Sequence, residues 1–513
     1  MKTYPLALLA QVLEARWIPA QNGRERFCGV SSDTRSLQAG ELFCAIIGEK
    51  FDGHAFLDQA VAKGAAALML SDPQAIARWE GKIPVLAVPE TNRAYFQTAA
   101  WYRRQLRGHV IAVSGSVGKT GTRDFIYFAL RKAAGALSKS VRRTEANLNN
   151  IFGIAQTILA APEDLDYLVL EIGIDKPGEM EDLSALAQPN IAVVTNIGSS
   201  HLEQFQSREL LRDEKLAIRS HLMDGGLLIV NGDDALLGPW LQTEAARRFR
   251  AAGFRLAAVS LGRAREEEAS GSENGPLSAR SVCAWLEVRA LHMTASGSDF
   301  ALSYHRSGEA ASSALAPGLP LVHLGRYGLH MVQNAAFACL CVLELGLDIA
   351  LGAEGLQDYV ETGRRLRRLD GAHMTVIDDS YNASPESCLA ALDYLAVTSA
   401  AEGRRSVAAL GCIAELGSES DAIHRALGRA AAAHAPAVLY ICGPDAQAFA
   451  EAYLEIKPEA LCRVFADREK LNAALMPLLQ AGDILLVKGS HCYEMYKTAE
   501  CAWNALEKQN SAV

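Results

Sequence analysis

Short, almost continuous apolar runs recur in the middle of the chain from His109 onward, and a stretch of helical length follows each one. The runs are HVIAVS, DYLVLEIGI, NIAVVTNIG and GGLLIVNGD. Uninterrupted apolar runs of this length are typical of parallel strands that helices cover on both faces. The pattern therefore predicts a central parallel α/β sheet.

A second series of such runs follows a basic cluster late in the chain: MTVIDD, SVAALGCI, AVLYICG and DILLVKGS. Three of these runs lead into loops that contain Gly411, Gly443 and Gly489. Ligands of open α/β sheets lie beyond the carboxyl ends of the strands, so these loops are predicted to face a site. Two separate sheets in one chain also imply a cleft between them.

The remaining segments complete a three-part organisation. Up to about Arg107, short β-type runs such as GELFCAIIG and KIPVLAVPE alternate with alanine-rich helical stretches, which predicts a small α/β unit. The polar stretch from Arg263 to Arg280 is predicted to be a loop, and helix resumes from Gly328 to about Leu347.

Length and composition agree with this organisation. The chain has 513 residues, and about 150 residues per domain suggests three domains. Half of the residues are apolar and 21% are charged, as in globular proteins with several cores. We therefore expect an α/β protein with a small first domain, a central parallel-sheet domain and a Rossmann-like third domain, at residues 1–107, 108–357 and 358–513.

Charge, cysteine usage and hydropathy exclude several classes of protein. Lys plus Arg number 50 and Asp plus Glu 59, a net charge of −9, whereas a nucleic-acid surface needs a concentrated basic stripe. The 11 cysteines include no C-x-x-C pair, which argues against a zinc ribbon and a secreted disulfide framework. The N-terminal stretch has the pattern of a helix rather than of a signal peptide, and no run is suited to cross a membrane. We expect a cytoplasmic monomer without nucleic-acid partners or membrane insertion.

The segment IAVSGSVGKTGTRDF carries the strongest chemical signal in the chain. An apolar strand leads into a glycine turn, after which a helix opens. In such loops backbone N–H groups and the helix N-terminus hold phosphates, a lysine neutralises β and γ oxygens, and a threonine reaches Mg²⁺. The general pattern has glycine where Val113 stands, so an ordinary glycine-rich turn is the alternative. We predict a nucleotide site formed by Gly115, Ser116, Val117, Gly118, Lys119 and Thr120.

Three further residues are open to two interpretations from sequence alone. Glu171 and His201 end or follow neighbouring apolar runs and would emerge near the phosphate loop if those strands pair. Equally, Glu171 could be a buried acid paired with an arginine, and His201 a surface helix cap. Lys215 would ordinarily be solvated, but a buried amine could react with carbon dioxide and give a metal-binding carbamate.

Taken together, these segments resemble the Mur ligase family over nearly the whole chain. GVSSDTRSLQAGELFCAIIGEKFDGHAFLDQAVAKGAAALML is similar to its first domain; GSVGKT, EANLNNIFGIAQTIL, LEIGIDKPGEM, TNIGSSHLEQFQS and DEKLAI to its ATPase segments; and GLHMVQNAAFA, GRRLRRLDGAHMTVIDDSYNASPES and VKGSH to its later signatures. The segments DDSYNASP and TNIG…HLE are specific to this group, whereas GKT alone is not.

The resemblance implies ATP-dependent amide bond formation through an acyl phosphate. Within the family, the greatest similarity is to the ligases that add D-alanyl-D-alanine to a UDP-N-acetylmuramoyl tripeptide in peptidoglycan synthesis. The implied first domain binds the UDP precursor, the central domain binds ATP, and the third domain closes on ATP and the amine. Closure is expected because water would hydrolyse the acyl phosphate.

Site residues follow from the resemblance position by position. It implies two Mg²⁺ ions, one held by Thr120 and Glu171 and the other by His201 and carbamylated Lys215. Lys119, His201 and Lys215 would be the catalytic residues. ATP would also be contacted by Asn334, Arg364, Asp379, Tyr381 and Asn382. The UDP-muramoyl peptide and the amine would be contacted by Ser31, Asp33, Thr34, Arg35, Asn147, Asn150, Lys488 and His491.

Three positions depart from the family pattern. Met331 stands where Asn is usual, Cys412 replaces Asp, and His491 replaces an Arg that would supply a fixed positive charge near the incoming substrate. The phosphate and metal residues are intact, so the departures bear on the amine more than on ATP chemistry.

Two alternatives follow. One is a ligase of the same family with a different carboxylate and amine. The other is a nucleotide-binding partner subunit, although such Mur-like proteins typically carry a four-cysteine zinc insertion that this chain lacks. The N-K-x-D motif of a GTPase-type switch is absent.

Overall fold

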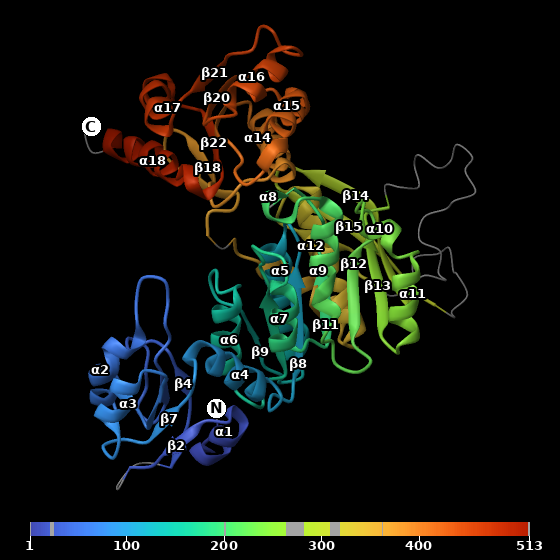
Figure 1. The fold of residues 1–513 in the computed structure, drawn as a ribbon. Coiled ribbons are helices and arrows are strands. Elements are labelled where there is room, and N and C mark those ends of the chain that lie inside the picture. Colours follow the sequence, from blue (N-terminus) through green and yellow to red (C-terminus); the bar gives the residue numbers. More distant parts are fainter. Residues whose placement is uncertain are drawn as a thin grey trace.

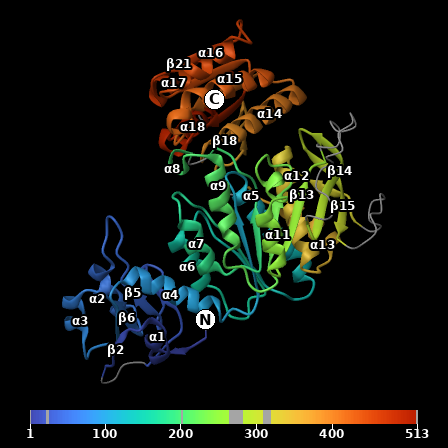
Figure 2. The same ribbon diagram turned by 45° about the vertical axis from the view of Figure 1, so that its right-hand side comes forward.

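The computed structural model describes residues 2–20, 25–199, 202–262, 282–307, 319–361 and 363–510. Three α/β units follow one another along the chain, coloured blue, green to yellow, and orange to red in Figure 1. The central unit lies between the other two (Figure 2). The predicted three-part α/β fold is confirmed, while the domain bounds at residues 107 and 357 stay predictions.

The first unit is built on a five-stranded sheet of order β2-β7-β6-β5-β4. Its strands are β2 (Arg16–Ile18), β4 (Val30–Ser31), β5 (Leu42–Cys44), β6 (Ala67–Leu70) and β7 (Val85–Ala87), and only β2 runs antiparallel to its neighbour. A two-stranded sheet pairs β1 (Tyr4–Pro5) with β3 (Arg26–Phe27). The helices are α1 (Leu6–Leu13), α2 (Leu57–Ala62), α3 (Pro73–Trp79) and α4 (Thr91–Arg103).

The central sheet has nine strands in the order β16-β15-β14-β13-β12-β11-β8-β10-β9. The parallel strands are β8 (His109–Ser114), β9 (Val141–Arg143), β10 (Tyr167–Glu171), β11 (Ile191–Val194), β12 (Leu227–Asn231), β13 (Arg255–Ser260) and β14 (Ala284–Thr294). The four predicted runs correspond to β8, β10, β11 and β12. Two antiparallel strands, β15 (Gly297–Arg306) and β16 (Val322–Leu324), extend one edge beyond what the apolar runs predicted.

Helices cover both faces of this sheet, as predicted. Alternation along β8 shows why: Val110 and Ala112 belong to one apolar core, and Ile111 and Val113 to the core on the opposite face. The first core contains residues of α6 (Ile151–Leu159), α7 (Glu179–Ala187) and α9 (Arg208–Leu216). The second contains residues of α5 (Lys119–Gly135), α12 (Leu329–Glu344) and α13 (Ile349–Gly355). The shorter helices are α8 (Leu202–Phe205), α10 (Leu237–Trp240) and α11 (Glu244–Ala251).

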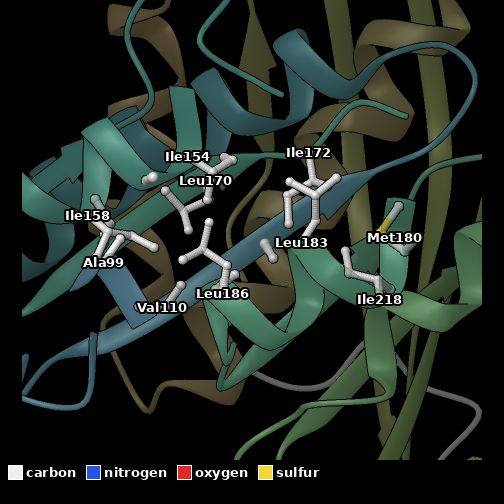
Figure 3. Packing of buried hydrophobic residues seen from close by; sticks show 14 of the residues in the cluster. Ala99, Val110, Ile154, Ile158, Leu170, Ile172, Met180, Leu183, Leu186 and Ile218 are labelled. Carbon is white, nitrogen blue, oxygen red and sulfur yellow. The ribbon is translucent and has the colours of Figure 1, made fainter. Parts of the chain in front are cut away.

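The first core also joins the first unit to the central one. Ala99 of α4 lies with Ile154 and Ile158 of α6 and with Leu186 of α7 in a continuous apolar cluster (Figure 3). Buried Arg103, near the end of α4, donates through Nε to the carbonyl of Ala187 at 2.8 Å.

The C-terminal sheet has six strands in the order β17-β18-β22-β19-β20-β21. They are β17 (Arg367–Asp370), β18 (Thr375–Asp379), β19 (Ser406–Gly411), β20 (Val438–Cys442), β21 (Cys462–Phe465) and β22 (Ile484–Lys488), all parallel except β17. The helices are α14 (Pro385–Glu402), α15 (Ser420–Ala431), α16 (Ala446–Leu454), α17 (Arg468–Leu475) and α18 (Tyr496–Asn510). All four runs predicted here are strands.

The C-terminal unit meets the central unit at the carboxyl ends of its strands. The Glu203 amide donates to the Glu415 carbonyl at 3.1 Å, and the Tyr327 hydroxyl donates to Asp393 Oδ2 at 2.7 Å. The rings of Tyr327 and Tyr394 stack with centroids 6.0 Å apart. The predicted loop from Arg263 to Arg280 lies outside the described residues. In the described part of the chain, no helix has the length and apolar character needed to cross a membrane.

Candidate active site

A cavity of about 690 Å³ lies between the central and C-terminal units, at the carboxyl ends of the central strands. Central residues on its wall include Ser116 to Gly121 and Glu171. The C-terminal unit contributes Asp379, Tyr381 and Lys488. The cleft expected from two facing sheets is therefore present, and it brings together residues distant in sequence.

Two glycines give the phosphate loop its shape. Gly115 and Gly118 have φ angles of 146° and 84°, conformations that side chains with a Cβ rarely adopt. A Cβ on Gly118 would also lie 2.9 Å from Asn334 Oδ1. Gly118 is the N-cap of α5, so the first amides of this helix have no carbonyl one turn earlier and can bind an anion.

Lys119 and Lys215 share one backbone acceptor. Lys119 Nζ donates to the carbonyls of Gly115 at 2.7 Å and Ser116 at 3.1 Å, and Lys215 Nζ donates to the same Gly115 oxygen at 3.2 Å. Burial lowers the pKa of Lys119 to about 8. Burial, and then the charge of Lys119, hold the pKa of Lys215 well below its usual range, and Lys215 is only 1% exposed. The two amines thus lie close together at the phosphate loop, where a bound phosphate would be attracted to the positive charge of Lys119.

One polar atom of the loop has no partner within the described residues. Ser116 Oγ is buried and makes no hydrogen bond. Buried hydroxyls are normally bonded, and because Ser116 lines the cavity, this hydroxyl is available to bond a ligand there. Together with the α5 amides and Lys119, this hydroxyl fits the phosphates of a nucleotide.

Glu171 is both a cavity residue and a member of a buried ion-pair network. Arg123 Nη1 donates to its Oε2 at 3.1 Å, and Asn149 Nδ2 donates to its Oε1 at 3.0 Å. Arg123 also pairs with Asp124. The buried pair with an arginine, left open by the sequence, therefore exists. Arg123 and Asn149 were not predicted from sequence, because only the folded arrangement brings them to Glu171.

Of the three asparagines of the central unit predicted to contact substrate or ATP, two line the described cavity and one does not. Asn150 lines the cavity and caps α6, accepting from the Gly153 amide at 3.0 Å. Asn147 is exposed and does not belong to the described lining of the cavity. Asn334 lies on the wall beneath the loop, and its Oδ1 accepts from Thr122 Oγ1 at 2.9 Å.

On the opposite wall, a buried ion pair organises the segment after β18. Lys488 Nζ, in a residue only 2% exposed, donates to Asp379 Oδ2 at 2.6 Å and to the Asn382 carbonyl at 3.0 Å. Asp379 Oδ1 accepts from the Leu366 amide at 3.0 Å. Lys488 lines the cavity, and its two hydrogen bonds hold the Asp379–Asn382 segment in place. Its predicted contact with substrate stays a prediction.

Adjacent arginines take different positions in this unit. Arg364 pairs with Glu500 at 2.7 Å and with Asp378 at 3.5 Å, and it does not line the described cavity. Arg365 does line it, with its guanidinium 4.1 Å from the centre of the Tyr381 ring. The charge of Arg365 also contributes to lowering the pKa of Lys119. Arg365 therefore lies on the described cavity wall, while the ATP contact predicted for Arg364 stays a prediction.

Several predicted residues lie away from the cavity. Asp33 and Arg35 pair with each other at 2.7 Å, Ser31 Oγ donates to the Asp33 carbonyl at 3.0 Å, and Thr34 Oγ1 donates to Gln59 at 3.2 Å, all in the first unit. His491 is exposed, with its ring 6.3 Å from that of Tyr381. His201 lies outside the described residues.

The family departures have unequal consequences. Cys412 is 2% exposed and packs against Gly443, where an added Cβ would lie 3.0 Å from its Sγ; burial raises its pKa to about 12. Cys412 is therefore a packing residue. Met331 lines the cavity beside His330, whose pKa burial lowers to about 4, so that this imidazole is neutral. Of the three departures, only Met331 lines the described cavity.

Comparisons with known proteins cover all three units. Family models match at residues 26–108 (Mur ligase family, catalytic domain), 113–342 (Mur ligase middle domain) and 364–491 (Mur ligase, glutamate ligase domain). The chain is similar to "UDP-N-acetylmuramoyl-tripeptide--D-alanyl-D-alanine ligase" of Bacillus subtilis (30% identity, 90% of each chain) and of Escherichia coli (31% identity, 91% of each chain).

Solved structures give the same result. A crystal structure of MurF from Acinetobacter baumannii is similar with a TM-score of 0.76 and 26% identity, covering 98% of this chain and 99% of that one. MurF of Thermotoga maritima in complex with ADP shares the fold, with a TM-score of 0.69 and 22% identity over 94% of this chain and 98% of that one.

Proposed function

Because the chain belongs to the Mur ligase family, we propose that this ATP-dependent peptide ligase adds D-alanyl-D-alanine to UDP-N-acetylmuramoyl-tripeptide in peptidoglycan synthesis. One observation carries the proposal: the phosphate loop, with Lys119 and the unbonded Ser116 hydroxyl, faces a second α/β sheet across one cavity. Such a cavity can hold ATP between two units while a carboxylate and an amine meet beside it. We propose that the protein acts as a monomer in the cytoplasm.

The reaction would proceed in two displacements. A carboxylate oxygen of the tripeptide attacks the γ-phosphorus of ATP, the bond to ADP breaks, and an acyl phosphate forms. The amine nitrogen of D-alanyl-D-alanine then attacks the acyl carbon, phosphate leaves with the bonding electron pair, and the nitrogen releases a proton to solvent. Lys119, the α5 amides and Ser116 would hold the phosphates in line, so the protein contributes mainly positioning and electrostatic stabilisation.

Mg²⁺ is the metal that the family implies, and the residues present fit it. Thr120 and Glu171 offer oxygen ligands on the cavity wall. The Glu171 oxygens accept one hydrogen bond each, from Arg123 and Asn149, which leaves lone pairs for a cation. We propose that they hold one Mg²⁺, and that His201 and carbamylated Lys215 hold a second. Bound Mg²⁺ would offset charge on the transferring phosphoryl group.

Lys215 is suited to carbamate formation because its burial favours the neutral amine. The nitrogen lone pair would attack the carbon of CO₂, one C=O bond pair would move to oxygen, and the nitrogen would lose a proton. The product is an anionic oxygen ligand in place of a neutral amine. Its negative charge would attract the ammonium group of Lys119 nearby.

The other two units would supply the substrates and exclude water. We propose that Ser31, Asp33, Thr34 and Arg35 bind the UDP part in the first unit, and that Asn147 and Asn150 lie along the path of the peptide toward the cavity. The C-terminal unit would close on ATP and the amine. We propose that Asp379, Tyr381 and Asn382 contact ATP, together with Arg365 in place of the predicted Arg364, because these four residues line the cavity.

A direct assay tests the function. The purified protein is given ATP, Mg²⁺, UDP-N-acetylmuramoyl-tripeptide and D-alanyl-D-alanine, and phosphate release is followed with each substrate omitted in turn. Release that requires both the tripeptide and the dipeptide is expected. Because His491 stands exposed near Tyr381 in place of the family's arginine, a panel of other amines belongs in the same experiment. Release with another amine only would replace the D-alanyl-D-alanine assignment.

The neighbouring arginines provide a matched pair of variants. Arg365→Ala should lower kcat/KM for ATP by roughly 10²-fold, because it removes a cation facing the phosphates. Arg364→Ala should leave kcat/KM within about threefold, since it breaks partly exposed ion pairs of small energetic value. Steady-state kinetics with varied ATP measure both. The reverse order of effects would restore Arg364 as the nucleotide ligand.

A further inference from the structure

We propose that Thr195 and Asn196, which follow β11, are positioning residues that hold the phosphate loop in its nucleotide-binding shape. The inference rests on the proposed function, since it concerns how ATP is held. Neither residue was predicted as a site residue from sequence. The TNIG…HLE segment that contains them contributed only His201 to the predicted site. Thr195 is 2% exposed, and Asn196 lines the cavity.

The backbone of this pair continues the sheet beyond the end of β8. The Thr195 amide donates to the Ser114 carbonyl at 2.9 Å, and the Ser116 amide donates to the Asn196 carbonyl at 3.0 Å. The loop therefore remains attached to β11 for two residues after the regular strand pairing ends. This attachment fixes where the loop leaves the sheet.

The side chains then bind the next peptide group, at Val117. The Val117 amide donates to Asn196 Oδ1 at 2.9 Å, and Asn196 Nδ2 donates back to the Val117 carbonyl at 2.9 Å. Thr195 Oγ1 donates to the same carbonyl at 2.6 Å. One asparagine thus bonds both polar groups of one residue, as a neighbouring strand would. Val117 stands in the middle of the loop, where no regular structure could satisfy these groups.

Thr195 and Asn196, here called the clamp, determine which polar groups of the loop remain available to bind phosphates. The amides of Ser116 and Val117 are bonded to Asn196, so the phosphates are left to the α5 amides, Ser116 Oγ and Lys119. Lys119 is in turn bonded to the Gly115 and Ser116 carbonyls, whose positions the clamp sets. The Thr195 hydroxyl also occupies the space that a Cβ on Gly115 would need. Holding the loop in advance reduces the ordering that nucleotide binding must impose.

Two nearly isosteric variants test the clamp. Thr195→Val removes the hydroxyl donor, and Asn196→Asp replaces the amide donor by an oxygen while keeping the acceptor. We expect each to weaken ADP binding in calorimetry by about tenfold, as for the loss of one hydrogen bond, and to raise KM for ATP more than it lowers kcat. The melting temperature without nucleotide should stay close to that of the unmodified protein.

Matched controls separate positioning from folding. Thr195→Ser keeps the hydroxyl and should retain ADP affinity within about twofold. Asn231→Ala alters an asparagine at the end of the adjacent β12, which accepts from the Asp233 amide at 3.0 Å and does not belong to the described cavity wall, and should bind normally. If Asn196→Asp fails to fold, the comparison of ADP affinity between Thr195→Val and Thr195→Ser still tests the inference.

The outcomes distinguish the inference from the function on which it rests. If the unmodified protein binds ADP and Thr195→Val binds it equally well, the clamp is wrong and the ligase proposal stands. If Thr195→Val and Thr195→Ser lose affinity alike, in proportion to a fall in melting temperature, the role is structural and the inference is again overturned. If the unmodified protein itself does not bind ADP, the proposed function fails.

Discussion

Replacement of Lys119 by alanine is expected to reduce phosphate release by roughly 10³-fold while the protein stays folded. The ammonium group lies at the phosphate loop and donates to the Gly115 and Ser116 carbonyls. Lys119 is the one cationic residue among Gly115 to Thr120, so no other residue of the loop can replace its charge. Lys132→Ala is the control on the same helix, since Lys132 pairs with Glu354 at the surface. Activity of Lys119→Ala close to that of the control would refute the phosphate-loop assignment.

The pH dependence of ADP binding gives a second measurement of the same lysine. Burial lowers its pKa from 10.5 to about 8, so the free protein loses this positive charge above about pH 8. ADP affinity should therefore fall as pH rises through 8, by up to tenfold per unit, and Lys119→Arg should abolish the fall. The same pKa shift also affects stability, in the opposite direction. Between about pH 8 and 10.5 the Lys119 amine is protonated in the unfolded chain and neutral in the folded chain. The contribution of Lys119 to the free energy of unfolding therefore rises with pH.

The second large effect is expected at Lys215. Lys215→Ala should lower turnover by roughly 10²-fold to 10³-fold, and added short carboxylates should restore part of it by supplying the missing anionic oxygens. Burial favours the neutral amine that carbon dioxide requires, so a ¹³C resonance of a carbamate should appear when the unmodified protein is equilibrated with labelled bicarbonate. The resonance should be absent from Lys215→Ala.

Arg212→Ala, on the same helix, serves as the control because Arg212 pairs with Asp213 near the surface. It should leave both turnover and the ¹³C resonance unchanged. Full activity of Lys215→Ala would make Lys215 a packing residue. Lost activity with neither rescue nor resonance would show that the amine itself, and not a carbamate, is required.

Much of the fold could be predicted because the central strands are buried on both faces. Continuous apolar runs at β8, β10, β11 and β12 are compatible with few structures other than buried parallel strands. The four runs of the C-terminal sheet were predicted as strands for the same reason. The hairpin of β14 and β15 was harder to predict. The outer half of β14 alternates between partly buried and exposed residues, so its signal is weaker than that of a continuous run.

The candidate site was predicted best where one short segment carries it. Residues Gly115 to Thr120 lie together because a strand, a turn and a helix place them. Asn149, Arg123 and Asn196 were missed, since each acts on a residue that only strand order brings near. Arg365 was not predicted as a cavity residue, because which of two adjacent arginines faces the cavity depends on how an irregular segment turns its side chains, and no periodicity encodes this.

The place of β22 in the C-terminal sheet has a consequence for synthesis of the protein. This strand is the last one in the part of the chain that the structure describes, yet it lies between β18 and β19. Until β22 has been synthesised, β18 and β19 each have one unpaired edge, and such edges can pair with strands of other molecules. A polypeptide truncated before Ile484 would also leave Asp379 without Lys488. Translation past Lys488 is therefore a condition for assembling the nucleotide-facing wall, and products that end before this residue should aggregate rather than compete for substrate.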